Sequence, residues 1–295
     1  MSTSAAPTSE APTSESNCLV CGSDRSQRLY TLQQGSLVRC QQCCLVFYTP
    51  RPSAEELAAY YNTAPYRERY KASIMSDQTF AAGRYAELST ILKRYAPALL
   101  PPHQKRLLDI GCGVGDLLQA AKAAGWQVTG TEIADRAIAQ ADATVKNEIL
   151  LGDILQLRLP ANAYDVITSY HVIEHLLNPV EVLSTIYRLL RPGGMALIET
   201  PNFGGLGARI RGKHWSHIIP PEHLTYFESG SLRYALKQAG FTTFRILTSS
   251  PQVIDSVATL PAGLRPIATT AYRLAPVAGL GAALQAIAFK EALSG

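Results

Sequence analysis

Four cysteines near the start of the chain have a spacing that could bind a metal ion. Cys18 and Cys21 form one Cys-x2-Cys pair, and Cys40 and Cys43 form a second pair after 18 intervening residues. Four thiolates at this spacing can close tetrahedrally around one zinc ion. Such a site has no open coordination position, so we expect it to contribute folding energy to a segment too small to build its own core.

Two disulfides or unlinked thiols are the alternative for these cysteines. Disulfides need an oxidising compartment, and residues 1–16 lack the basic start and the apolar core of a signal peptide. We therefore predict a zinc-binding segment in a cytoplasmic protein. Cys44 lies next to the fourth ligand and could compete with it, whereas Cys112 is expected to be a small packing residue.

A glycine-rich turn is the second pattern that points to chemistry. The apolar run 106–110 predicts a strand, and the apolar spacing over 114–124 predicts a helix. Between them lie Gly111, Gly113 and Gly115. Glycine is required where the backbone turns tightly and lies against a ligand, because a Cβ would block the approach. The order of strand, turn and helix predicts a nucleotide-binding α/β fold.

The residues after this turn favour one class of ligand. A second strand is predicted over 127–133, and Glu132 near its end stands where such folds place an acid that accepts both ribose hydroxyls. A dinucleotide-binding turn would have Gly or Ala at position 116, but the third glycine falls one place early, at Gly115, and Asp116 takes the slot. S-adenosylmethionine has no pyrophosphate, so this departure favours it over a dinucleotide.

From this turn onward the chain resembles the class I S-adenosylmethionine-dependent methyltransferases, and the likeness continues through most of residues 104–295. Leu151–Ile154 is similar to the end of the family's third strand, and Tyr164–His175 to its fourth strand and the turn that follows. Leu189–Ile198 is similar to a helix, a tight turn and the fifth strand. Phe241–Ser249 and Ala283–Glu291 could supply the antiparallel pair that closes the family's sheet.

The resemblance implies a fold and a set of cofactor-binding residues. The fold is a Rossmann-like, seven-stranded α/β sheet with helices on both faces, preceded by a small zinc ribbon and a helical connector. The cofactor is S-adenosylmethionine, with the Asp153 side chain and the next amide holding the adenine. The implied cofactor-binding residues are Asp109, Gly111, Cys112, Gly113, Gly115, Glu132, Ile133, Asp153, Ile154 and Tyr170.

The N-terminal cysteines help to predict the molecule that accepts the methyl group. Together with the Tyr48–Pro52 stretch they resemble a group of bacterial methyltransferases, several of which act on sugars or on cell-envelope and secondary-metabolite precursors. We therefore expect a small-molecule acceptor of that kind, such as a sugar or nucleotide sugar. The alternative is a quinone or other aromatic hydroxyl, because the Glu174-His175 turn also resembles that of quinone-biosynthesis O-methyltransferases.

A hydroxyl acceptor needs a general base, and histidine meets that requirement near neutral pH. Five of the six histidines fall in two segments, 171–175 and 214–223, that should share one rim of the sheet. Our hypothesis is that His171, His217 or Glu222 serves as the base. For each residue taken singly, a structural role in a loop is the competing interpretation.

Two other functional classes compete with this interpretation. Residues 171–175 match the H-x-x-E-H pattern of one metalloprotease class, but they end an apolar strand, and Asn178-Pro179 is a poor continuation for a ligand-bearing helix. A related hypothesis, in which Glu174 and His175 hold a catalytic divalent cation in a methyltransferase, stays open. The other class is a non-catalytic zinc-ribbon adaptor that binds S-adenosylmethionine, which the intact set of cofactor residues argues against.

Composition and patterning define the domain organisation. The 295 residues are 47% hydrophobic and 17% charged, which describes a globular protein, and a net charge of +4 is too small and dispersed to indicate nucleic acid. No apolar run is long enough to span a membrane. The predicted units are a disordered tail (1–16), a zinc ribbon (17–50), a helical connector or lid (51–102) and the cofactor-binding domain (103–295).

Two segments carry further hypotheses. The basic cluster 209–214 could bind a phosphate-bearing acceptor, or it could be a solvated loop. Residues 251–281 form an insertion between the last two predicted strands, rich in apolar residues and poor in charge. This insertion could cap the pocket, pair with a second subunit in a homo-oligomer, or rest on a membrane surface.

Overall fold

The computed structural model describes residues 17–61, 63, 78–100, 103–250, 263 and 265–292. The predicted tail of residues 1–16 and the boundary at 101–102 lie outside these residues, as do positions 66–70 of the predicted lid and 251–262 of the insertion. Among the described residues, no helix is long and apolar enough to cross a membrane.

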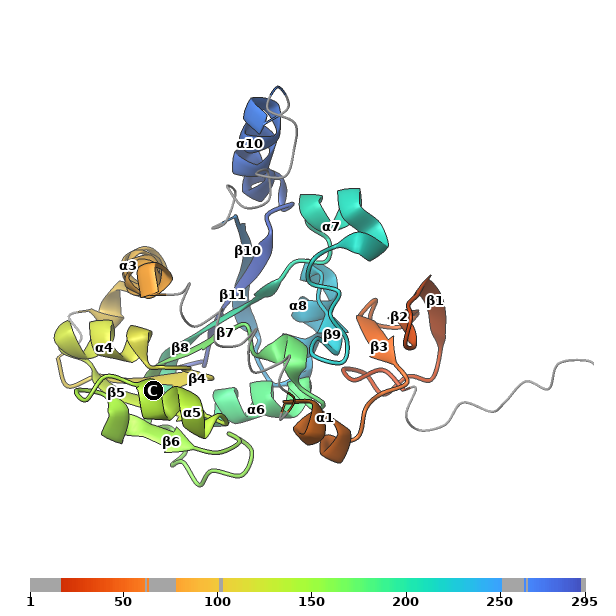
Figure 1. Ribbon diagram of the computed structural model, residues 1–295. Helices are drawn as coiled ribbons and strands as arrows, with labels where there is room; N and C mark the ends of the chain where they lie inside the picture. Colours follow the sequence, from red (N-terminus) through yellow and green to blue (C-terminus); the bar gives the residue numbers. More distant parts are fainter. Residues whose placement is uncertain are drawn as a thin grey trace, which may run out of the picture.

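A seven-stranded sheet forms the centre of the molecule, with the strand order β10-β11-β8-β7-β4-β5-β6 (Figure 1). Five of its strands run parallel: β4 (Arg106–Ile110), β5 (Gln127–Glu132), β6 (Ile149–Leu151), β7 (Tyr164–Tyr170) and β8 (Leu190–Pro201). The strand β11 (Ala283–Phe289) is antiparallel to both β8 and β10 (Thr243–Ser249). The predicted fold class, including the closing antiparallel pair, is confirmed.

Two pairs of helices cover the two faces of this sheet. They are α3 (Gln78–Tyr95) with α4 (Asp116–Ala123), and α6 (Pro179–Leu189) with α8 (Ser229–Gln238). Neighbouring strand residues point to opposite faces: Leu107 belongs to the core under α3 and α4, and Leu108 to the core under α6 and α8. Because both faces are buried, the parallel strands are almost uniformly apolar.

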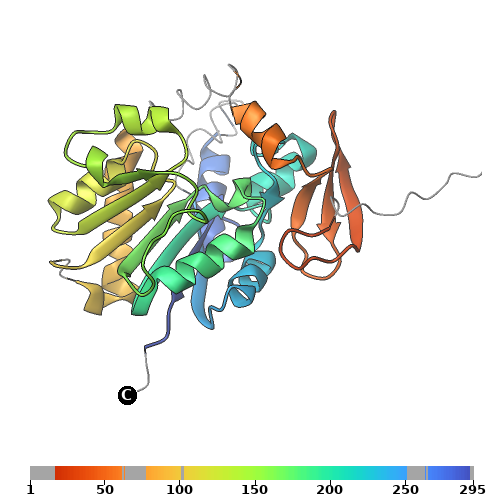
Figure 2. The same ribbon diagram turned by 90° about the horizontal axis from the view of Figure 1, so that it is seen from below.

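The N-terminal segment forms a second, four-stranded sheet beside the body (Figure 2). Its order is β1 (Ser26–Thr31), β2 (Ser36–Cys40), β3 (Val46–Thr49) and β9 (Thr225–Tyr226). The last strand comes from the body of the protein, where it pairs with β3. Leu45 and Phe47 are buried in the same core as Phe227 and Leu232, so the small sheet is packed onto the body.

The predicted connector contributes two helices that have different neighbours. The helix α1 (Ala54–Tyr61) follows the small sheet, whereas α3 lies on the large sheet, where Leu88 and Leu92 pack in one core with Leu117 and Leu118 of α4. By its packing, α3 is part of the body. The limits at residues 50 and 102 remain predictions.

The remaining elements are short and lie between the strands. They are η2 (Pro97–Leu99), α5 (Asp135–Gln140), η3 (Lys146–Glu148), η4 (Ile173–His175), α7 (Leu206–Arg211), η5 (Gly212–His214), α10 (Arg265–Leu274) and η7 (Ala275–Ala278). Of these, η4 and the segment from α7 to β9 follow β7 and β8 and therefore lie at the carboxyl edge of the sheet. This is the edge where parallel α/β sheets bind their ligands.

Candidate active site

The glycine turn after β4 has the backbone conformation that its sequence predicts. Gly111, Gly113 and Gly115 all have positive φ, at 69°, 56° and 82°. A Cβ on Gly111 would lie 2.5 Å from the Val172 side chain, so the turn is closely packed there. At Gly113 nothing lies within 4 Å of a Cβ position, so this side of the turn is open to a ligand.

Glu132 connects this turn to the end of β5. One carboxylate oxygen accepts the Gly113 N–H at 2.9 Å, and the other accepts the Ala134 N–H at 2.9 Å. Burial raises the pKa of Glu132, although these backbone hydrogen bonds oppose the shift. The Glu132 carboxylate is a hydrogen-bond acceptor beside open space, which is the chemistry needed to bind vicinal hydroxyls such as those of ribose.

The residues predicted to hold the adenine lie next along this edge. Asp153 is exposed after β6, and its carboxylate accepts the Leu155 N–H at 2.9 Å. Ile133 is 66% exposed, whereas Ile154 is buried. An exposed apolar side chain and an exposed carboxylate at one edge suit a flat heterocycle that carries an amino group.

Asp109 and Cys112 are closely packed at the turn, and their role in cofactor binding remains a prediction. The Asp109 carboxyl is buried and accepts the Thr168 hydroxyl at 2.7 Å, and burial raises its pKa to about 7. The Cys112 sulfur lies only 2.6 Å from the position that a Cβ on Gly130 would take. Both residues therefore pack against the turn.

Tyr170 and Arg84 extend the site towards β7. Tyr170 is buried at the end of β7, and the Arg84 guanidinium lies 4.7 Å from the centre of its ring. The proximity of Arg84 also opposes the rise in the pKa of Asp109 that burial causes. Sequence analysis missed Arg84, because its position on the predicted helix gives no signal of the face that meets the sheet.

His171 is held between two buried carboxylates. Its Nδ1 lies 3.3 Å from Glu174 and its Nε2 lies 3.2 Å from Glu199. Burial would lower the pKa of His171, but these two partners outweigh burial and raise it to about 10. An imidazole that keeps both protons has no lone pair, so in this arrangement His171 is a donor rather than a base.

Glu199 is a site residue that sequence analysis missed. It is buried near the end of β8, directly opposite Tyr170 in the strand register. Gln285 of β11 donates to Glu199 and to Glu87 of α3, each at 2.7 Å. A charged residue within an apolar strand was the available signal, because buried carboxylates require partners.

Glu174, His175 and His223 form a group that could hold a metal ion. One ligand atom from each lies within 4.8 Å of the others. The Nδ1 of His175 lies 2.9 Å from the Glu222 carbonyl, and that of His223 lies 2.9 Å from the His217 carbonyl. Since a carbonyl only accepts, each Nδ1 carries a proton, and Nε2 is the nitrogen that a metal would bind.

The H-x-x-E-H pattern is not built on an α-helix. Residues 173–175 form the short 3₁₀ turn η4, and His171 precedes it with a positive φ of 53°. His171 is paired with Glu174 and Glu199, and His223 takes its place beside Glu174 and His175. The two histidines of the pattern therefore do not present ligands from one helix face.

His217 and Glu222 lie beside this group. The His217 ring lies 4.7 Å from that of Trp215 and 6.1 Å from that of His223. Burial, followed by the charge of His171, lowers the pKa of His217 to about 4, so its ring is neutral and has a lone pair at neutral pH. The Glu222 carboxylate accepts the hydroxyl of Tyr60 from α1 at 3.3 Å. The structure thus brings all three candidate bases to one rim.

The four cysteines also come together. The sulfurs of Cys18 and Cys43 are 3.4 Å apart and those of Cys21 and Cys40 are 3.5 Å apart, and all four lie within 4.8 Å of one another. These distances exceed the 2.05 Å of a disulfide and approach the ~3.8 Å expected between sulfurs in a tetrahedral zinc site. Cys44 is exposed.

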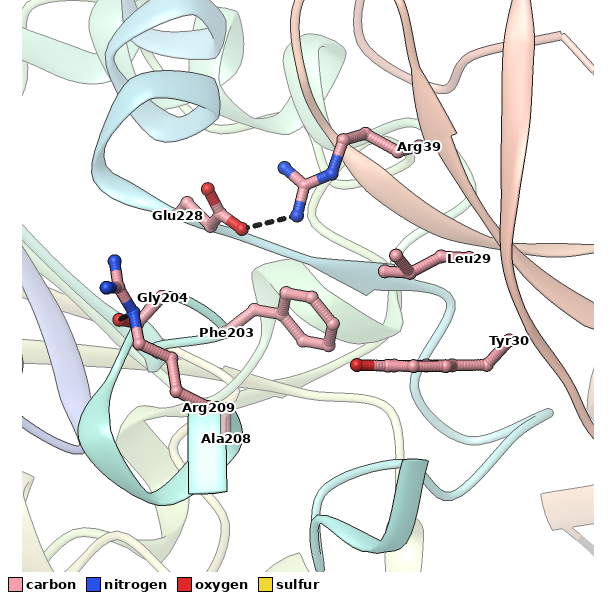
Figure 3. A pocket seen from close by; sticks show the side chains of 8 residues that line it. All are labelled: Leu29, Tyr30, Arg39, Phe203, Gly204, Ala208, Arg209 and Glu228. Carbon is pink, nitrogen blue, oxygen red and sulfur yellow. Dashed lines mark hydrogen bonds and ion pairs between the residues drawn. The ribbon is translucent and has the colours of Figure 1, made fainter. Parts of the chain in front are cut away.

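A cleft of about 430 Å³ lies between one part of the small sheet and the body (Figure 3). Tyr30 and Leu29 of β1 lie on one side, and Phe203 and Arg209 lie on the other. An ion pair of 2.7 Å between Arg39 and Glu228 crosses one end of the cleft. Arg209, which belongs to the predicted basic cluster 209–214, lines this cleft.

Comparison with known proteins agrees with the geometry. Residues 80–245 match the family model described as a methyltransferase domain, which is more than half of the chain. Over 159 residues the chain is 31% identical to a ubiquinone biosynthesis O-methyltransferase of Burkholderia ambifaria, covering 47% of this chain and 68% of that protein. The chain belongs to the methyltransferase-domain family and is an S-adenosylmethionine-dependent methyltransferase.

Solved structures share the fold. A SAM-dependent methyltransferase from Archaeoglobus fulgidus is 22% identical, with a TM-score of 0.53 over 74% of this chain and 99% of that one. A possible histamine N-methyltransferase from Thermotoga maritima is 19% identical, with a TM-score of 0.52 over 75% of this chain and 98% of that one. At these identities the likeness shows the fold alone.

The Glu132 contacts generate a prediction about cofactor affinity. The variant Glu132→Gln should bind S-adenosylmethionine at least about tenfold more weakly, because the amide lacks the charge and offers one acceptor oxygen in place of two. Isothermal titration calorimetry measures the affinity. Glu148→Gln, which removes an exposed carboxylate paired with Lys122, is the matched control and should bind normally. Equal affinities for both variants would contradict the assignment.

Proposed function

We propose that this enzyme transfers the methyl group of S-adenosylmethionine to a hydroxyl of a small acceptor bound beside η4 and the 214–223 segment. The observation that carries the proposal is the group of histidines and carboxylates at the sheet edge, next to the glycine turn. Proton removal from a hydroxyl is the main chemical task that the protein must supply, since the thioether leaves as a neutral molecule.

The chain's own residues fit the cofactor. The open side of Gly113, the Glu132 carboxylate and the exposed pair Ile133 and Asp153 suit the nucleoside. When bound, S-adenosylmethionine supplies an electrophilic methyl group. Holding an acceptor in line with that group can lower the barrier by roughly 7–11 kcal/mol at best.

We assign the proton transfer to His217 or Glu222. His217 has a low pKa, so its ring has a lone pair at neutral pH. Glu222 is a carboxylate that accepts a hydrogen bond from the Tyr60 hydroxyl. His171 keeps both ring protons and donates them to Glu174 and Glu199, so its proposed role is to hold these two carboxylates in place beside the acceptor. A divalent cation on Glu174, His175 and His223 is a second means of acidifying the acceptor.

The names of the relatives support one acceptor class, and we propose an aromatic hydroxyl of a quinone precursor. The curated relatives at about 30% identity are named as ubiquinone biosynthesis O-methyltransferases. The cleft of Figure 3 supports a second candidate, a sugar or nucleotide sugar, because Arg209 and two aromatic rings line it. A guanidinium beside aromatic rings suits a phosphate-bearing acceptor.

An acceptor panel tests the proposal. Purified enzyme is incubated with S-adenosylmethionine and either catechol-type phenols or nucleotide sugars, and S-adenosylhomocysteine formation is measured. We expect turnover with the phenols. Turnover with nucleotide sugars alone would move the assignment to the second candidate. Binding of S-adenosylmethionine in calorimetry without turnover on either class would favour the non-catalytic adaptor.

Variants at the three candidate residues separate their roles. Alanine at His217 or Glu222, whichever is the base, should lower kcat by about 100-fold or more, with affinity for S-adenosylmethionine nearly unchanged. If His217 is the base, the wild-type rate should be flat between pH 6 and 8 and fall as the pH approaches about 4, where the ring gains its proton. His214→Ala, an exposed neighbour, is the control. Undiminished turnover in the variants of His171, His217 and Glu222 would refute the scheme.

We further propose that the four cysteines bind one structural zinc ion. Cys21→Ser should lose the zinc and lower the melting temperature, because metal affinity is coupled to the folding of this small sheet. Metal content is measured by mass spectrometry of the purified protein. Cys44→Ser, at the exposed neighbouring thiol, should retain about one zinc per chain. A metal-free wild-type protein of equal stability would count against the zinc site.

A further inference from the structure

The exposed apolar side chains of this protein are concentrated in one place. Seven large hydrophobic residues are exposed among the described residues, and four of them lie on α7, α10 and η7. Ile210 and Ile267 are each 69% exposed, Leu274 is 61% exposed and Val277 is 89% exposed. Such a concentration on a monomer's surface marks an interaction site.

The helix α10 has its apolar stripe turned outwards. Ile267, Ala271 and Leu274 follow one another at i, i+4 and i+7 and are all exposed. The opposite face carries Tyr272, which is buried. A surface helix of a globular protein normally buries its apolar stripe, so an outward-facing stripe is typical of a binding surface.

The same projection carries only positive charge. In the described parts of 204–221 and 263–282 there are five basic residues, Arg209, Arg211, Lys213, Arg265 and Arg273, and no Asp or Glu. The two helical segments form one unit, because a Cβ on Gly207 of α7 would lie 3.2 Å from the Tyr272 hydroxyl, and the Leu206 N–H donates to the Leu280 carbonyl at 2.9 Å. Figure 1 shows α10 projecting from the body at the end where α7 lies.

We propose that the projection formed by α7, α10 and η7 docks on the surface of a bilayer that contains anionic phospholipids. Apolar side chains that enter the headgroup boundary and cations that meet lipid phosphates are the two requirements for a helix lying in the interface. A second copy of the chain satisfies only the first requirement, because two positively charged faces repel one another. The inference rests on these residues and does not depend on the proposed acceptor.

Cosedimentation of the full chain with vesicles tests this proposal. We expect binding to vesicles of phosphatidylglycerol and phosphatidylcholine that is much stronger than binding to phosphatidylcholine alone. The double variant Ile267→Ser with Leu274→Ser should reduce the partition coefficient by about tenfold or more. Arg273→Glu should weaken binding to the anionic vesicles and leave the weak binding to neutral ones unchanged.

Matched controls come from the other end of the sheet. Leu150→Ser removes an exposed apolar residue of β6, and Arg136→Glu reverses an exposed charge of α5; both should bind vesicles as the wild type does. Calorimetry with S-adenosylmethionine verifies that every variant is folded. Equal partitioning of all variants, or no binding of the wild type, would overturn the proposal. A dimer in light scattering that the double variant dissociates would assign the face to a second copy instead.

Discussion

The arrangement of this site depends on the cost of burying carboxylates. Glu174 and Glu199 are each almost fully buried at the carboxyl edge of the sheet, and an unpaired carboxylate there would be strongly unfavourable. The protonated ring of His171 carries one positive charge and contacts both carboxylates, at 3.3 and 3.2 Å. The Thr200 hydroxyl adds a hydrogen bond of 2.9 Å to Glu174. Burial would raise the pKa of Glu174, but the hydrogen bond from His171 and the nearby histidines lower it to about 2.

This pairing accounts for the unusual backbone at the site. His171 adopts a positive φ, a conformation that costs energy for a residue with a side chain. The conformation turns the chain sharply after β7, so that the ring reaches Glu199 of the neighbouring strand while η4 brings Glu174 to its other side. The two contacts with carboxylates offset the strain, and a histidine that serves two buried acids is poorly suited to act also as a base.

Local patterns in the sequence were sufficient for β4, β5 and the glycine turn between them, because each depends on a few adjacent residues, whereas the other strands of the large sheet were predicted from the family resemblance. The strands β4 and β5, the three glycines and Glu132 lie within about 30 residues of one another. Glu199, His223 and Arg84 could not be placed in the same way. Glu199 enters the site through its register with Tyr170, and Arg84 enters because one face of α3 packs on the sheet. Strand register, and the choice of which helix face packs on the sheet, are tertiary properties that the local spacing of residues does not encode.

Leu224 connects the small N-terminal sheet to the histidine group. The Leu224 carbonyl accepts the Tyr48 N–H of β3 at 2.9 Å, and the Leu224 N–H donates to the Glu174 carbonyl at 2.8 Å. His223 immediately precedes this residue, and β9 immediately follows it. The backbone that aligns His223 beside Glu174 is therefore the backbone that the small sheet holds. Because β3 pairs with β2 of the cysteine-bearing segment on one side and with β9 on the other, we expect folding of the N-terminal segment to affect the alignment of the candidate active site.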